Sequence, residues 1–299
     1  MCQKLQKRTI AGRVDSVCVF MGSIIELLVT ITARRRELLE ESYHTYLNRV
    51  AKMTLPATYE SQVKNIQQSP KFRLADSGQR EEVSFPGYSV ITPPGVEDTG
   101  NAGVYADLVT CQQHLTKTLE PDLLVLVNPA SFHFTLADLI WDSAYRMATD
   151  NNPEFESKLI ERIEDSFSIY QKSTVEAQPI RWQIMGLTVR PRAIEVSLVP
   201  KDEYSYDRIS SFRRAIYQSS SLIGLGIEQQ YYFTAHMTLA YFANVQQEID
   251  RTRLSDTLQA YNMHWREQPQ EILLSEGQLR QFTDMTNYER KPNFPVIQL

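Results

Sequence analysis

A pattern of five residues that occurs twice constrains the fold of this chain more than any other feature. The sequence reads His133-Phe134-Thr135-Leu136-Ala137 at one position and His236-Met237-Thr238-Leu239-Ala240 at another. Side chains two residues apart lie on the same face of a β-strand, and their neighbours lie on the opposite face. Each copy therefore predicts a strand that carries a histidine and a threonine on one face and large apolar side chains on the other.

The repetition of the whole pattern points to function, because a single His-x-Thr in a half-buried strand is usually just the polar face of a sheet. Only five histidines occur in the chain, and two of them lie in these matching contexts. We expect the two strands to face each other, with both imidazoles and both hydroxyls in one cleft. The remaining histidines, His44, His114 and His264, are expected to be structural or exposed.

The composition excludes some classes of function. The net charge is -5 and the pI is near 5.7, whereas tight binding of a long nucleic acid depends on neutralising many phosphates. A small phosphorylated ligand needs only a local positive charge, so it remains compatible with this balance. Cys2, Cys18 and Cys111 form neither a disulfide framework nor a zinc pattern, and we expect a cytoplasmic protein.

Residues 1–36 are predicted to be a peripheral or disordered N-terminal extension. They begin with a basic stretch, followed by the largely apolar run Val17–Ala33 and then by three arginines. The run falls short of the ~20 residues that a membrane-spanning helix needs, and Glu26 interrupts it. We therefore expect no membrane association, with a tether through residues 17–33 as the weaker alternative.

Residues 37–84 are predicted to be a helix followed by a polar linker. Apolar residues recur at helical spacing over residues 37–52. Residues 60–82 are polar and aperiodic, which favours a linker or a loose loop.

Residues 85–299 are predicted to form the main domain. Strand, helix, strand and motif strand are followed by helix, hairpin, helix and motif strand, and then by a helix and closing strands. This order indicates two similar halves, each with one His-x-Thr strand. We expect an α+β architecture in which mostly antiparallel sheets meet at a central groove and helices lie outside.

From about Phe85 to Leu299 the chain resembles the 2H phosphoesterase superfamily, which is named for two His-x-Ser/Thr motifs. The longer contexts SFHFTLADLIWDS and FTAHMTLAYF resemble a little-characterised bacterial branch that is defined only as a domain of unknown function. The resemblance implies a bilobal, LigT-like fold with pseudo-twofold symmetry and both motifs in the cleft. It also implies a phosphoric diester hydrolase that uses no metal or cofactor and opens a cyclic phosphate or phosphodiester of a nucleotide or RNA end.

The chemistry of the repeated residues is consistent with this implication. Free imidazole titrates near pH 6.5, so His133 and His236 can act as a general base and a general acid at neutral pH. Thr135 and Thr238 can donate hydrogen bonds to phosphoryl oxygens. The sequence does not assign base and acid between the two histidines. Arg213 and Arg214 are candidates for an additional positive group near the phosphate.

Two other functions remain open at this point. One is a 2'-5' RNA ligase-like enzyme that runs the reverse reaction, although the net negative charge of the chain disfavours a surface that holds two polynucleotide ends. The other is a non-catalytic module of the same fold that binds a phosphorylated ligand or RNA end, although both histidines and both threonines are present. The expected partner is a small phosphorylated substrate or RNA end, and the expected state is a monomer.

Overall fold

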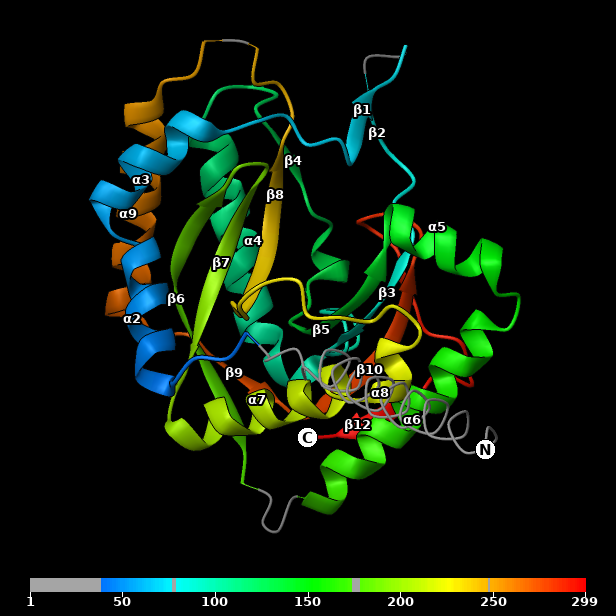
Figure 1. Cartoon of the computed structure of the whole chain (residues 1–299). Coiled ribbons are helices and arrows are strands. Elements are labelled where there is room, and N and C mark those ends of the chain that lie inside the picture. The colour runs from blue at the N-terminus through cyan, green and yellow to red at the C-terminus, as the bar shows by residue number, and fades with distance from the viewer. Residues whose placement is uncertain (1–38, 77–78, 174–177, 247) are drawn as a thin grey trace, which may run out of the picture. The chain divides into compact units, whose positions relative to one another are not determined.

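Two antiparallel sheets of five strands each form the centre of the computed structural model, which describes residues 39–76, 79–173, 178–246 and 248–299 (Figure 1). The first sheet has the strand order β11-β10-β3-β5, and β12 also pairs with β10. Its strands are β3 (Gly87–Ile91), β5 (Thr135–Trp141), β10 (Glu276–Phe282), β11 (Tyr288–Glu289) and β12 (Val296–Gln298). The second sheet has the order β4-β8-β7-β6-β9. Its strands are β4 (Leu124–Leu126), β6 (Ile180–Arg190), β7 (Ala193–Pro200), β8 (His236–Phe242) and β9 (Glu271–Leu274).

Helices pack around these sheets, so the predicted α+β class with antiparallel sheets is confirmed. Helices α2, α3 and α9 contact β6, and α4 contacts β8 (Figure 1). Helix α7 contacts β5 of the first sheet and both β6 and β7 of the second. The helices are α2 (Tyr43–Met53), α3 (Pro56–Gln62), α4 (Ala102–Thr118), α5 (Asp142–Asn151), α6 (Phe155–Ser173), α7 (Glu203–Tyr217), α8 (Ser220–Ile223) and α9 (Arg251–Glu267).

An aromatic core joins helix α2 to both repeated motifs. Trp182 of β6 is fully buried and packs edge-on against Tyr46 of α2 and Phe134 of the first motif, with ring centres 5.8 and 5.3 Å apart. Phe233, which lies just before the second motif, packs against the same indole at 5.9 Å. Burial of these rings fixes the two motifs relative to each other.

The first motif lies slightly outside the strand that we predicted for it. Strand β5 begins at Thr135, so His133 precedes it, whereas His236 is the first residue of β8. The backbone around His133 is still held, because Thr92 N–H donates to the Phe134 carbonyl at 2.9 Å. In return, Phe134 N–H donates to the Thr92 hydroxyl at 3.0 Å. His133 is therefore fixed by neighbouring hydrogen bonds rather than by the strand ladder.

Residues 60–82 are not the loose linker that we expected. They contain the end of α3, a short 3-10 helix at Val63–Asn65, and the hairpin strands β1 (Phe72–Leu74) and β2 (Arg80–Glu82). Phe72 is buried, and its ring lies 5.4 Å from that of Tyr241 on β8. Each of these short elements has only one or two apolar anchors, which is too few for a periodic pattern.

Helix α5 is likewise absent from the sequence prediction. None of its residues is buried, so it has no apolar stripe by which a helix is recognised. Helix α2 is shorter than the predicted helix over residues 37–52, because the Ser42 side chain caps it by accepting from Thr45 N–H at 3.2 Å.

The predicted extension over residues 1–36, including the apolar run 17–33, lies outside the described residues. Residues 39–299 form one compact unit, which includes α2 as well as both sheets. Within the part of the chain that is described, no helix is both long enough and apolar enough to cross a membrane.

Candidate active site

A cavity of about 960 Å³ is lined by both sheets and brings the two repeated motifs together. His133 and Thr135 line it from the first motif, and His236 and Thr238 line it from the second. The apolar residues of both motifs are buried on the opposite faces, as the alternating pattern predicts. The four residues chosen from sequence therefore share one site.

The two imidazoles are held in the same way. His133 Nδ1 lies 2.7 Å from the carbonyl oxygen of Ser131, and His236 Nδ1 lies 2.7 Å from that of Thr234. A carbonyl oxygen can only accept a hydrogen bond, so Nδ1 carries a proton in both rings. This fixes each ring through its own backbone two residues upstream and leaves Nε2 for chemistry.

His133 has an apolar environment that favours its neutral form. Its ring packs against that of Tyr288 on β11, with ring centres 4.3 Å apart. The pKa of the His133 imidazole is lowered to about 4, chiefly by burial and also by the charge of His236, although the Ser131 carbonyl acts in the opposite direction. At pH 7 the Nε2 atom of His133 is therefore an unprotonated acceptor.

His236 instead faces a carboxylate. Its Nε2 lies 3.7 Å from Oε1 of Glu195 on β7, and Arg190 Nε donates to Oε2 of the same carboxylate at 2.8 Å. Burial raises the pKa of Glu195, but the charges of His236 and Arg190 outweigh burial, and the net pKa is lowered. Glu195 is therefore ionised at neutral pH and places a negative charge beside His236.

Both motif strands contain a β-bulge at the same place in the pattern. The register with β3 shifts at Leu136, and the register with β7 shifts at Leu239. A bulge rotates the strand that follows it and can redirect a side chain toward a site. The residue five positions after each histidine, Asp138 in one copy and Tyr241 in the other, accordingly lines the cavity.

Arg213 and Arg214, the two candidates for a positive group near the phosphate, do not line the cavity. Arg213 is buried, donates to the Leu136 carbonyl at 2.6 Å, and stacks on Phe233 with 4.2 Å from its guanidinium carbon to the ring centre. Arg214 pairs with Glu40 at 3.0 Å on the surface. Both arginines stabilise the fold around the motifs instead.

The cations that do line the cavity are Lys71, Arg190 and Arg192. Lys71 was not identified from the sequence because it lies within residues 60–82, which we predicted to be a linker. The two arginines flank Pro191 where β6 turns into β7. Glu195 could have been noticed in the sequence as the one charged residue of strand β7.

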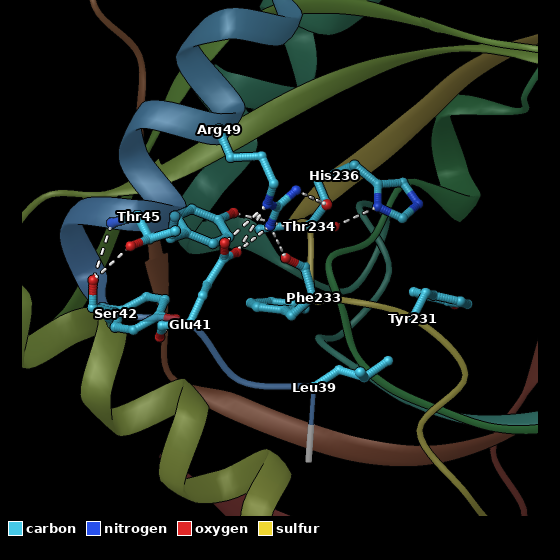
Figure 2. A network of polar contacts seen from close by, with 12 residues as sticks. Leu39, Glu41, Ser42, Thr45, Arg49, Tyr231, Phe233, Thr234 and His236 are labelled. Carbon is cyan, nitrogen blue, oxygen red and sulfur yellow. Dashed lines mark hydrogen bonds and ion pairs between the residues drawn. The ribbon is translucent and has the colours of Figure 1, made fainter. Parts of the chain in front are cut away.

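Helix α2 holds the segment that leads into the second motif (Figure 2). Arg49 donates through Nη2 to the Phe233 carbonyl at 2.6 Å and through Nη1 to the Thr234 hydroxyl at 2.8 Å. Glu41 accepts from Arg49 Nε at 3.0 Å and so orients the guanidinium. Since the Thr234 carbonyl holds His236, Arg49 positions the catalytic candidate through one intermediate residue.

Tyr46 adds a second connection from α2 to the same segment. Its hydroxyl donates to the Leu198 carbonyl of β7 at 2.8 Å and accepts from Ala235 N–H at 3.0 Å. The hydroxyl thus bridges β7 and the residue immediately before His236. Neither Tyr46 nor Arg49 was identified from sequence, because an amphipathic helix normally uses such residues for packing or solubility.

Within the described residues, no group of three or more His, Cys, Asp or Glu side chains is arranged to hold a metal ion. His264, far along the chain on α9, lies 3.2 Å from Asp107 of α4, and the same carboxylate accepts from the Trp265 indole. This cluster ties α4 to α9 and is separate from the cavity.

No protein-family model matches the sequence, and no curated protein matches it. Among solved structures, the chain is similar to the conserved protein of unknown function ATU0111 from Agrobacterium tumefaciens, with a TM-score of 0.51 and 14% sequence identity. The match covers 75% of this chain and 90% of that one. At this identity the similarity shows a shared fold and no more.

Two further matches have lower TM-scores. TT0787 of Thermus thermophilus is 15% identical with a TM-score of 0.38, covering 71% of this chain and 94% of that one. E. coli LigT, solved in complex with 3'-AMP, is 13% identical with a TM-score of 0.36, covering 72% of this chain and 95% of that one.

Proposed function

We propose that the chain is a metal-independent phosphoesterase that opens a cyclic phosphate or phosphodiester of a nucleotide or RNA end. The observation that carries this proposal is the pairing of two histidines with opposite electrostatic surroundings in one cavity. Burial favours the neutral form of His133, whereas the Glu195 carboxylate lies 3.7 Å from Nε2 of His236. One group ready to accept a proton beside one ready to donate is what acid–base catalysis requires.

In the proposed hydrolysis, His133 Nε2 accepts a proton from the attacking water. The water oxygen forms a bond to phosphorus, and the bond between phosphorus and the leaving ribose oxygen breaks. His236 donates its proton to that oxygen, so both histidines exchange protonation states in each turnover. Each such proton transfer typically contributes ~10²–10⁴-fold in rate.

The threonines and the bound anion complete the proposal. Thr135 and Thr238 lie two residues after the histidines and can donate to the non-bridging phosphoryl oxygens as negative charge develops. A phosphate anion beside His133 would also raise the pKa of its imidazole from its low value. Substrate binding would therefore bring the base closer to the pH at which it works best.

The test is turnover by the purified full chain in the presence of EDTA. The substrates are nucleoside 2',3'-cyclic phosphates, ADP-ribose cyclic phosphate and 2'-5'-linked dinucleotides, with products separated by chromatography. We expect at least one of them to be hydrolysed, and His44→Ala, at an exposed histidine of α2, to retain the activity. Binding without turnover would favour the non-catalytic module, joining of RNA ends would favour the ligase, and loss of turnover with EDTA would contradict the mechanism.

A further inference from the structure

Lys71 enters the cavity on a segment whose backbone is fixed. Gln67 N–H donates to the Pro191 carbonyl in the β6–β7 turn at 2.6 Å, and Ser69 N–H donates to the Phe242 carbonyl at the end of β8 at 2.8 Å. Ser69 is only 2% exposed. Lys71 follows two residues later and lines the cavity together with Gln67 and Ser69.

The ammonium group of Lys71 lies over aromatic rings instead of beside a carboxylate. Its Nζ is 4.7 Å from the centre of the Phe85 ring and 5.1 Å from that of Tyr241. No carboxylate of the described residues comes within ion-pair distance of it. Cation–π contacts replace only part of the hydration that such a group loses on burial.

The electrostatics of Lys71 agree with this geometry. Its pKa is lowered to about 8, chiefly by burial and also by the charge of Arg192, against the opposing effects of Asp138 and Glu195. A ligand anion at this place would offset the burial and favour the charged amine.

Arg192 is a second cation of the cavity without a carboxylate partner among the described residues. Its neighbour in the same turn, Arg190, is already paired with Glu195. Arg192 is exposed, so its side chain is free to reach a ligand. Lys71 and Arg192 thus supply positive charge that no described carboxylate pairs with directly.

Tyr241 contacts both Lys71 and the second motif. Lys71 lies against the ring, whereas the Tyr241 hydroxyl interacts with the Thr238 side chain. An anion at Lys71 would then lie at the ring of Tyr241, and the phosphate that Thr238 would hold would lie at its hydroxyl. The cavity volume of about 960 Å³ leaves room for both groups on one nucleotide.

We infer that Lys71 and Arg192 form a second anion subsite, so that the substrate is a nucleotide or oligonucleotide end with a phosphate in addition to the reacting one. This inference rests on the proposed function, because the reacting phosphate is assigned to the two histidines. Lys71 and Arg192 would then select the substrate, and they would take no part in proton transfer.

The test compares the binding of adenosine 3'-monophosphate and adenosine 3',5'-bisphosphate by calorimetry at pH 7. We expect the full chain to bind the bisphosphate at least about tenfold more tightly, which corresponds to about 1.4 kcal/mol. In Lys71→Met this preference should fall to near unity, in Arg192→Gln it should be reduced, and in Lys71→Arg it should be retained. Lys64→Met, at an exposed lysine that does not line the cavity, is the matched control.

Thermal unfolding of each variant verifies that it is folded, and Lys71→Arg keeps the test informative if Lys71→Met is damaged. Equal affinity of the wild type for the two probes, absence of binding, or an unchanged preference in folded Lys71→Met would overturn the inference. The measurement needs no turnover. A bisphosphate preference that depends on Lys71 in a protein without hydrolytic activity would therefore reject only the proposed reaction.

Discussion

The two His-x-Thr motifs share their geometry and differ in their surroundings. Both histidines bind the carbonyl two residues upstream at 2.7 Å, and both strands are bulged at the leucine of the motif. The first motif leads into β5, which among the described strands pairs with β3 alone at the edge of its sheet, whereas the second lies on β8 between β4 and β7. A carboxylate approaches His236 from β7, and His133 has the ring of Tyr288 instead.

This difference shows how a repeated sequence can yield two unlike catalytic groups. The backbone carbonyl two residues before each histidine sets the tautomer and the direction of the ring. The neighbouring strands set the preferred charge of the ring, and those neighbours are not repeated. The proposed roles of base and acid therefore depend on Tyr288 and Glu195 rather than on the motifs.

The largest effect is expected from removing either histidine. His133→Ala or His236→Ala should lower kcat/KM by roughly 10²–10⁴-fold, and the double variant should be scarcely worse because the two residues act as a unit. Steady-state kinetics with circular dichroism of each variant provides the measurement. Two single losses that multiply in the double variant would show that the histidines act independently.

The threonines should give the next largest effect. Thr135→Val or Thr238→Val removes one phosphoryl donor with little change of shape, and we expect kcat to fall by ~10². Thr110→Val, which removes a hydroxyl from an exposed position of α4, serves as the control in the same assay. A change in KM alone would mean that the hydroxyl binds the ground state and the transition state equally.

Glu195→Gln should make the electrostatic surroundings of the two histidines more alike, because His236 would then no longer face a carboxylate. Loss of the carboxylate destabilises the imidazolium of His236, so we expect kcat to fall about tenfold and the alkaline limb of the pH–rate profile to move to lower pH. Glu120→Gln removes a carboxylate that also pairs with an arginine, but outside the cavity, and should leave the profile unchanged. An unshifted alkaline limb in Glu195→Gln would contradict the assignment of His236 as the acid.

Arg49→Met should affect the second motif alone. The Phe233 carbonyl and the Thr234 hydroxyl lose their donor, so we expect kcat to fall several-fold with little change in KM, and stability to fall by about 1–3 kcal/mol because Glu41 loses its partner. Arg49→Lys should recover part of the activity. Arg214→Met, which breaks the surface pair with Glu40, is the control. Equal kcat in Arg49→Met and the wild type would show that α2 only contributes stability.

The smallest effect concerns the stability of the first motif at acid pH. The pKa of His133 is about 4 in the folded chain and near 6.5 when unfolded, so between these values the unfolded chain binds more protons. Folding stability is thus unaffected by this group at pH 7 and declines as pH falls below about 6.5. The measurement is the free energy of unfolding in urea at pH 7 and at pH 5. Between these two pH values the free energy of unfolding of His133→Gln should fall by about 1 kcal/mol less than that of the wild type, after allowance for partial solvent exposure. His44→Gln should behave like the wild type, and the same loss in all three proteins would contradict the low pKa.

The regular part of the fold could be predicted from the sequence because its helices and strands bury apolar residues at regular spacing. The hairpin of β6 and β7 and the helices α4, α6 and α9 each bury several apolar residues at the expected spacing. The contributions of α2 and Lys71 to the site could not be predicted in this way. They depend on hydrogen bonds and ring contacts between segments far apart in the chain, such as Arg49 to Phe233 and Lys71 to Tyr241.

The choice of the wrong arginines has a similar cause. Arg213 and Arg214 stood out because they are adjacent on a helix, yet Arg213 is turned into the packing behind β5. The bulges were also unpredictable, since Leu136-Ala137 and Leu239-Ala240 read as uninterrupted apolar strand in both copies. Strict alternation would have directed Asp138 and Tyr241 away from the cavity.

These bulges divide each motif strand into two parts that can change separately. The histidine and threonine lie before the bulged leucine, and the variable position, Asp138 or Tyr241, lies after it. Because the offset between the two parts is built into the backbone, exchanging the residue after the bulge need not move the residues before it. Substitution of Asp138 or Tyr241 could therefore change which ligand the cavity prefers while the histidines and threonines keep their positions. Mutation during evolution would have the same freedom.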